Sequence, residues 1–385
     1  MQFTDEHQLF RQSVRRFVEG EINPHAEEWE ASGMFPAHEL FRKMGDLGFL
    51  GLTYPEQFGG LNLDFWYTVV FCEELGRADS SGVPMGITVH TDMCTPALAR
   101  HGSDALREQF LTPSITGEYV GCVAITEPDA GSDVAAIRTR AIADGDEWII
   151  TGRKLYITNG AQADWVCLLA RTSDEPGYRG MSLIVVPTRS PGFTVSRKLR
   201  KLGNHSSDTA ELIFEQVRVP RANTIGPEGK GFVLQMQQFQ RERLVGSIVS
   251  YASCEKIIRD AIAYTRQRHA FGKPLLANQV VQFKFAELLA EVEAQRALCY
   301  QCAEAYVRGE DITREASMAK LRAGRLARVV ADSCLQYYGG MGYMEETPIA
   351  RAFRDARLLS IAGGSDETML GIIAKMEGMT ADIRD

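Results

Sequence analysis

Apolar positions in the first third of the chain recur with the period of an α-helix. Four of them stand at i, i+4, i+7 and i+8, on one helix face: Phe10, Val14, Phe17 and Val18. Thr4 comes directly before two acidic residues, which is typical of a helix N-terminus. Further helices are expected at about 65–75 and, in two pieces that part near His101-Gly102, at 90–110. Residues 1–118 are therefore predicted to form a helical domain.

The pattern changes near residue 119. From there to about 220, short runs rich in β-branched and aromatic residues alternate with turn residues, and the clearest are 148–151, 165–170, 181–186, 193–195 and 210–214. Asp144-Gly145-Asp146 is typical of a hairpin turn. Strands grouped between helical blocks indicate a separate all-β domain, at 119–225.

The helical period returns at Gly231. Four apolar residues again share one face: Val245, Ile248, Val249 and Ala252. Two more long amphipathic helices are expected at 286–306 and 314–338. Long helices with one apolar stripe each favour a bundle, at 226–385. The fold class is therefore α+β: an all-α domain, a central β-barrel or sandwich, and a C-terminal helical bundle.

Composition narrows the class of protein. The 385 residues are 45% hydrophobic and 24% charged, an ordinary mix for a globular protein of two or three domains. The net charge of −8 argues against a nucleic-acid partner. No apolar run approaches the roughly 20 residues of a membrane span, and the polar N-terminus has no signal-peptide zones. We expect a cytoplasmic bacterial protein, although a processed organellar protein would look the same.

The eight cysteines do not follow zinc-site spacing, so reduced, mostly buried thiols and no metal site are expected.

Five segments carry candidate chemistry: 124–133, 154–160, 266–279, 336–343 and 354–367. Small and glycine-rich turns allow a flat or anionic ligand to approach the backbone closely. An arginine such as Arg268 suits a diphosphate, because a guanidinium donates two parallel hydrogen bonds. Taken one at a time, each segment also has an ordinary explanation, such as a β-turn, a hairpin or a helix end.

Glu242 is a sixth candidate. It stands three and seven residues before Val245 and Val249, so it shares a helix face with apolar residues. A carboxylate on such a face is either paired with an arginine, for example Arg241 or Arg243, or placed for a chemical task. From the residues alone, the ion pair is the commoner outcome.

Taken together, the segments resemble the acyl-CoA dehydrogenases, flavoenzymes that oxidise acyl-CoA thioesters to enoyl-CoA. The resemblance covers nearly the whole chain. It implies FAD as cofactor, acyl-CoA as substrate, electron-transferring flavoprotein as oxidant and a homotetramer. The residues that it implies for FAD are Ile125, Thr126, Ser132, Tyr156, Thr158, Arg268, Phe271, Gln279, Gln336, Gly340, Ser365 and Glu367. By the same resemblance, Arg268, Phe271 and Gln279 serve the FAD of a neighbouring subunit. Tyr156 stands where the family usually has tryptophan.

Many members of this family place the catalytic glutamate in the C-terminal loop, between an aromatic residue and a glycine. Here the three matching positions are Ala362, Gly363 and Gly364. The isovaleryl-CoA and long-chain acyl-CoA dehydrogenases are similar to this chain at that loop, and they carry their base just before an arginine on the helix that matches 240–245. The resemblance therefore implies Glu242 as base and the Gly363 N–H as the group that polarises the thioester carbonyl. The substrate contacts that it implies are Ser132, Phe239, Arg243, Ala362 and Gly363.

The small side chains at Ala362 and Gly363 leave room beside the acyl α- and β-carbons. This favours a branched acyl chain of the isovaleryl or citronellyl kind, with a straight medium or long chain as the alternative. Two other classes stay open: an acyl-CoA oxidase, which passes electrons to oxygen, and a non-catalytic member that only binds FAD or CoA.

Overall fold

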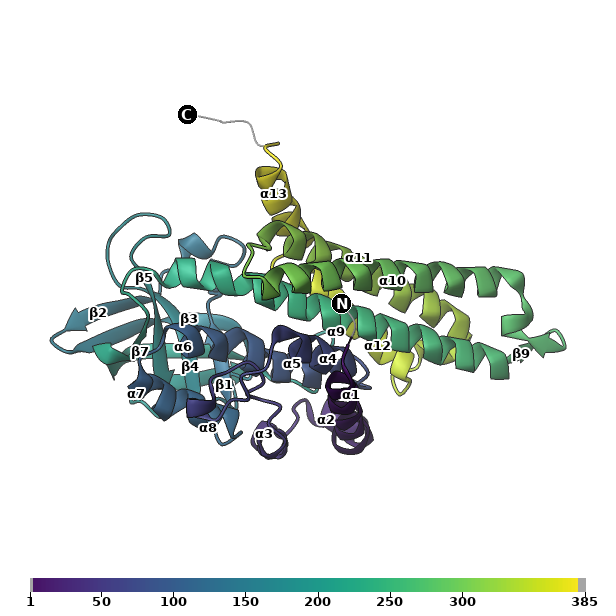
Figure 1. Ribbon diagram of the computed structural model, residues 1–385, viewed down its shortest axis with the longest axis horizontal. Helices are drawn as coiled ribbons and strands as arrows, with labels where there is room; N and C mark the ends of the chain where they lie inside the picture. The colour runs from purple at the N-terminus through teal and green to yellow at the C-terminus, as the bar shows by residue number, and fades with distance from the viewer. Residues whose placement is uncertain (1–2, 380–385) are drawn as a thin grey trace.

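The computed structural model describes residues 3–379, in helical, β and helical blocks that follow one another along the chain. Figure 1 shows the strands at one end of an elongated molecule, with the long C-terminal helices leading away from them and the N-terminal helices along one side. The block order is the one that the hydrophobic pattern predicts, whereas the boundaries after residues 118 and 225 stay predictions. No helix within 3–379 is long and apolar enough to span a membrane.

The most buried helix in the described part of the N-terminal block is α4 (Phe65–Leu75), of whose eleven residues all but Tyr67 are buried. The predicted helix start is confirmed: the Thr4 hydroxyl accepts a hydrogen bond from the His7 N–H, and α1 begins at Asp5. The predicted break is confirmed too, because α6 ends at His101 and Gly102 caps it. The helices of this block are α1 (Asp5–Phe17), α2 (Ala26–Ser32), α3 (Ala37–Asp46), α4, α5 (Gly82–Thr88), α6 (Thr95–His101), α7 (Asp104–Leu106) and α8 (Thr112–Ile115). Three π-helical turns interrupt them: η1 (Val18–Ile22), η4 (Val89–Cys94) and η5 (Arg107–Leu111).

The central block is an eight-stranded sheet of order β6-β7-β3-β2-β4-β5-β8, with β1 parallel to β4. Alternate residues of β4 enter two cores. Trp165, Cys167 and Leu169 pack with α6–α8, whereas Val166 and Leu168 pack with β3 and β7. The strands are β1 (Gly121–Ala124), β2 (Arg140–Asp144), β3 (Glu147–Thr158), β4 (Trp165–Arg171), β5 (Met181–Pro187), β6 (Phe193–Lys198), β7 (Thr209–Pro220) and β8 (Thr224–Ile225).

The C-terminal block is organised by α9 (Gly231–Gln267), which spans about 55 Å at 1.5 Å per residue. It begins directly on β5: a Cβ at Gly231 would collide with the backbone of Ser182 and Leu183, so only glycine allows this approach. Alongside α9 pack α10 (Gln279–Val307) and α11 (Thr313–Tyr338), followed by α12 (Pro348–Ala356), η10 (Arg357–Ser360) and α13 (Asp366–Met376).

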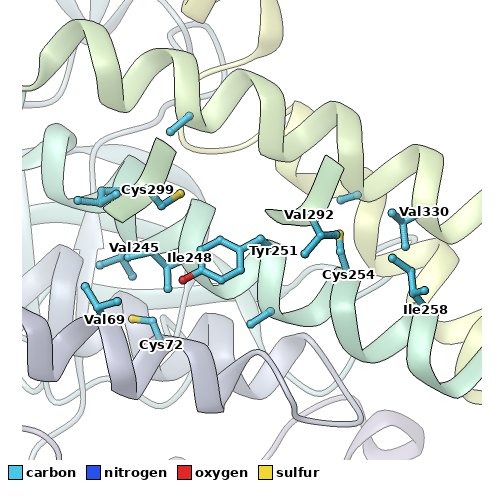
Figure 2. Close-up of a cluster of buried hydrophobic side chains, with 14 of the residues drawn as sticks. Val69, Cys72, Val245, Ile248, Tyr251, Cys254, Ile258, Val292, Cys299 and Val330 are labelled. Carbon is cyan, nitrogen blue, oxygen red and sulfur yellow. The ribbon is translucent and has the colours of Figure 1, made fainter. Parts of the chain in front are cut away.

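The largest core forms where α9 lies between α4 and the pair α10 and α11. Figure 2 shows the buried side chains that meet there, among them Val69, Cys72, Val245, Ile248, Tyr251, Val292, Cys299 and Val330. The predicted apolar stripe of α9 is thus its core-facing side. All eight cysteines are free and buried, as expected.

Truncation of Leu288 on α10 tests the packing of this core. Leu288 lies in the cluster and is 2% exposed, whereas Leu9 on α1 is 64% exposed. Leu288→Ala is expected to lower the free energy of unfolding by about 2–5 kcal/mol, because it leaves a cavity. Leu9→Ala removes the same atoms from the surface, so the change should stay within about 0.5 kcal/mol. Urea unfolding measures both, and equal losses would contradict the packing of α10 described here.

Candidate active site

Glu242 lies on α9 with its carboxylate turned into the protein. The side chain is 9% exposed, and its Oε1 accepts hydrogen bonds from the amides of Gln235 and Gln238, each at 3.0 Å. Burial raises the pKa of Glu242 from 4.5 to about 7; the two amides and the charge of Arg243 act in the opposite direction. A carboxylate with such a pKa can take up a proton near neutral pH.

The two neighbouring arginines are engaged elsewhere. Arg241 pairs with Asp92 at 2.8 Å, and Arg243 donates to the Ser317 hydroxyl at 3.3 Å. Among residues 3–379, no lysine or arginine lies within 4 Å of the Glu242 carboxylate. The ion pair that the residues alone favoured is therefore wrong. The reason is geometric: successive helix positions point about 100° apart, so residues 241, 242 and 243 face different surroundings.

The pair of Asp92 and Arg241 ties α9 to the π-helical turn η4. Both side chains are buried, and Arg241 also donates to the Thr53 hydroxyl at 3.4 Å. A buried ion pair is costly to break from one side, so this pair stabilises the contact of α9 with η4 beside Glu242. Asp92 was not singled out from the sequence, and no local pattern marks it, because it lies 149 positions before Arg241.

The C-terminal loop reaches the same part of α9. The 3-10 turn η10 contacts both α9 and α11. The Leu359 side chain comes within 3.8 Å of a Cβ position at Gly246 of α9, and the Leu359 carbonyl oxygen comes within 3.2 Å of one at Gly324 of α11. After η10, the buried Lys320 of α11 donates to the Gly364 carbonyl. Burial lowers the pKa of Lys320 to about 8. Residues 361–364 are therefore held beside the segment that carries Glu242 and Arg243.

Gly363 is exposed and has a backbone φ of +65°, which favours glycine. Its N–H donates to no residue that the structure describes, and a Cβ there would meet nothing within 4 Å. The exposed Ala362 precedes it; Ser365 caps α13 by accepting from the Thr368 N–H, and Glu367 lies in the first turn of that helix. The loop thus offers a free N–H donor beside open space.

The predicted flavin segments lie side by side in the β block. The Leu155 N–H donates to the Thr126 carbonyl at 2.9 Å, and the buried Lys154 donates to the Ile125 carbonyl at 2.7 Å and to Glu127 at 2.9 Å. Sequence reasoning did not single out Lys154 and Glu127 as the pair that fixes this segment.

Tyr156 is the exposed aromatic residue of segment 154–160. It is 66% exposed and has a φ of +63°, a strained conformation for a residue with a large side chain. Thr158 lies two residues on, half-buried, and Ser132 is exposed. An exposed aromatic side chain beside the half-buried residues Ile125 and Thr126 suits a flat ring system, so the residues present fit the isoalloxazine of FAD.

The remaining predicted cofactor residues form a second group at the far end of the bundle. Arg268 caps α9, about 39 Å along the helix axis from Glu242. Tyr264 of α9 stacks on Tyr338 of α11 with ring centroids 4.0 Å apart, so the ends of these helices adjoin. The group consists of Arg268, the fully exposed Phe271, Gln279, Gln336 and Gly340. The fold does not bring it to Glu242 within one chain.

Comparison with known proteins decides the family. Models described as the N-terminal, middle and C-terminal domains of acyl-CoA dehydrogenase match residues 4–118, 122–217 and 229–377. The chain belongs to the acyl-CoA dehydrogenase family. Members of the family are FAD flavoproteins that dehydrogenate acyl-CoA in the catabolism of fatty acids or branched chains, and they are typically tetramers. FAD is therefore the cofactor of this acyl-CoA dehydrogenase.

Three relatives show how far this similarity extends. The long-chain specific acyl-CoA dehydrogenase of Rattus norvegicus is 40% identical, over 97% of this chain and 86% of its own length. The isovaleryl-CoA dehydrogenase of Oryza sativa is 35% identical, over 97% of this chain and 91% of its own length. The crystal structure of an acyl-CoA dehydrogenase from Geobacillus kaustophilus superposes with a TM-score of 0.94 at 42% identity, over 97% and 98%.

Glu242→Gln tests the burial of the carboxylate without any substrate. Because the folded-state pKa is raised from 4.5 to about 7, the protonated form stabilises the fold, and this stabilisation is lost as the pH rises through 7. Glutamine does not titrate. The stability of Glu242→Gln relative to wild type should therefore increase between pH 5 and pH 8, by up to about 3 kcal/mol. Urea unfolding of the flavin-loaded proteins measures it, with the exposed Glu108→Gln as control. A constant difference between the two pH values would contradict the raised pKa.

Proposed function

We propose that this acyl-CoA dehydrogenase uses Glu242 to remove the α-proton of an acyl-CoA thioester. One observation carries the proposal: Glu242 is a buried carboxylate with no cationic partner within the described residues, and burial raises its pKa to about 7. A buried charge left without a cation destabilises the fold, so its presence is best explained by a task. The usual acid of the C-terminal loop is absent at Gly363, so no second carboxylate competes for the role there.

Two residues of the chain have separate roles in the proposed reaction: Gly363 polarises the thioester carbonyl and Glu242 removes the α-proton. An α-proton next to an unassisted thioester is too weakly acidic for a carboxylate, so the carbonyl must be polarised. The Gly363 N–H, which has no acceptor among the described residues, is the proposed donor to that carbonyl. Glu242 takes the α-proton, and the C–H electron pair becomes the second bond between the α- and β-carbons. When bound, FAD accepts the β-hydride, so two electrons leave the substrate and enoyl-CoA remains.

The residues proposed to bind FAD fall into the β-block group and the far-end group described above. In the proposal, the residues of the β block contact the flavin ring: Ile125, Thr126, Ser132, Tyr156 and Thr158. Ser365 and Glu367 complete the set beside the C-terminal loop. We assign the far-end group to the FAD of a neighbouring subunit, since about 39 Å of α9 separates Arg268 from Glu242. In this group, Gln336 and Gly340 hold the adenosine half. The proposal therefore includes a homotetramer.

Phe239 and Arg243 are the proposed substrate contacts on α9. Arg243 lies over the Phe239 ring, with its guanidinium carbon 5.6 Å from the ring centroid. The two side chains therefore lie on one face of α9, and a cation on that face suits an anionic group of CoA. Electron-transferring flavoprotein is the proposed oxidant. Hydrogen peroxide formed without an added acceptor would instead indicate an acyl-CoA oxidase.

Anaerobic reduction of the flavin tests the base. Wild type mixed with acyl-CoA should lose its flavin absorbance, whereas Glu242→Gln should be slower by about 10²–10⁴-fold, because the proton acceptor is missing. Glu255→Gln, on the same helix, is the matched control and should behave as wild type. If Glu242→Gln bleaches as fast as wild type, the base assignment fails. If wild type does not bleach at all, the chain is a non-catalytic member of the family.

We propose a branched acyl chain as substrate. Ala362 and Gly363 replace larger side chains of the family, and the open space beside Gly363 supports room for a branch near the α- and β-carbons. A straight long chain is the second candidate, since the rat long-chain enzyme is more similar (40%) than the rice isovaleryl-CoA dehydrogenase (35%).

Two thioesters of equal main-chain length test whether the enzyme prefers a branched chain. With isovaleryl-CoA against butyryl-CoA, kcat/KM should favour the branched substrate at least about tenfold, the effect of one well-accommodated methyl group. Ala362→Tyr should reverse the preference by filling the space; this position has no positive φ, unlike Gly363. Ala143→Tyr, on an exposed part of β2, controls for the added bulk. A preference for butyryl-CoA in wild type would contradict the branched assignment.

A further inference from the structure

Two glutamines hold the carboxylate of Glu242. Gln235 and Gln238 precede it by seven and four residues, so the three side chains lie along one face of α9. Gln235 has no exposed surface and Gln238 is 3% exposed. Both amide nitrogens donate to the same atom, Oε1, at 3.0 Å.

The other carboxylate oxygen is left free. No residue within 3–379 donates a hydrogen bond to Oε2 of Glu242. Oε2 is also absent from the group of fully buried side-chain atoms that lack a hydrogen-bond partner. An oxygen that accepts two amide hydrogen bonds is the poorer proton acceptor, because its lone pairs are already engaged. The arrangement therefore makes Oε2 the basic atom and fixes the direction in which it points.

The orientation of the Gln235 and Gln238 amides is unfavourable for their own carbonyl oxygens. The carbonyl oxygens of Gln235 and Gln238 are both buried and have no hydrogen-bond partner within the described residues. An unpaired buried carbonyl is unfavourable, so this orientation needs a compensating gain. Charge-assisted hydrogen bonds to an ionised carboxylate supply that gain, and a protonated Oε1 would not.

Gln238 also connects Glu242 to the N-terminal block, because its amide donates to the Met93 carbonyl of η4. The charged and titratable groups that face Glu242 come from three elements: Asp92 on η4, Cys167 on β4, and Arg243 on α9. Asp92 disfavours the ionised carboxylate and Arg243 favours it. Cys167 is buried, and burial holds its thiol protonated. The two amides are the only hydrogen-bond donors that the described residues supply to the carboxylate.

We propose that Gln235 and Gln238 are positioning residues, which keep Glu242 ionised and present its Oε2 atom to the substrate. This inference rests on the proposed role of Glu242 as base. It goes beyond that role, because it assigns the proton-accepting atom and the groups that set the working pH of the site.

The pH profile of kcat/KM tests the inference. Gln238→Met and Gln235→Met keep the length of the side chain but remove the donor, so protonation of Glu242 becomes easier. The rising limb of the profile should move to higher pH by about one unit for each lost donor, with the rate at high pH largely retained. Gln235→Met leaves the contact with Met93 intact, so it separates this effect from a change in packing. Gln237→Met, exposed on the same turn, is the matched control and should leave the limb in place.

Infrared difference spectra of the flavin-loaded protein give a second readout that does not depend on turnover. The carboxyl band that disappears in Glu242→Gln should titrate at higher pH in both methionine variants. A uniform loss of rate at all pH values, with the limb and the band unmoved, would overturn the inference and leave the base assignment intact. A Glu242→Gln variant that still reduces its flavin at the wild-type rate would overturn the base assignment itself.

Discussion

The burial of one carboxylate without a cation is the constraint on which the rest of the site depends. Glu242 loses most of its hydration and, within residues 3–379, receives only two neutral amide donors in return. A residue in this position would normally be selected against, because its ionised form weakens the fold at neutral pH. The same desolvation moves the pKa into the range in which a carboxylate works as a base. Burial of this one side chain thus lowers the stability of the fold at neutral pH and at the same time gives the carboxylate a pKa suited to a base.

The surrounding structure keeps nearby cations from neutralising this carboxylate. Asp92 engages Arg241, and the Ser317 hydroxyl and the Phe239 ring engage Arg243. Lys320, the next buried cation, is directed to the Gly364 carbonyl. The contacts of Arg241 with Asp92 and of Arg243 with Ser317 also connect α9 to η4 and α11, and the contact of Lys320 connects α11 to the C-terminal loop. The groups that leave Glu242 unpaired are therefore the same groups that assemble the site.

The length of α9 separates two functions along one element. Its N-terminal part, seated on β5 and η4, carries the carboxylate, whereas its C-terminal end carries Arg268 beside Phe271 and Gln279. A rigid helix of about 55 Å cannot bring both ends to one small ligand. In the proposed assembly, a second copy of the chain would place its far end at the first copy's β block and so complete the cofactor site. The length of α9 therefore supports the proposed assignment of the far-end group to a neighbouring subunit.

The sequence by itself determined the elements and most of the candidate residues. Four local features were predictable: the Thr4 cap, the apolar stripe of α9, the turn at Gly145 and the end of α11 at Tyr338. Each depends on backbone preferences of residues close together in the chain. Helical spacing also singled out Glu242, and the same spacing could have found Gln235 and Gln238. Only the tertiary structure decided that Glu242 has no ion pair with any residue that the structure describes. That outcome depends on the pairing of Arg241 with a residue 149 positions away and on Lys320 reaching a carbonyl 44 positions away. Such pairings follow from how whole elements pack against one another, and no local pattern carries that information.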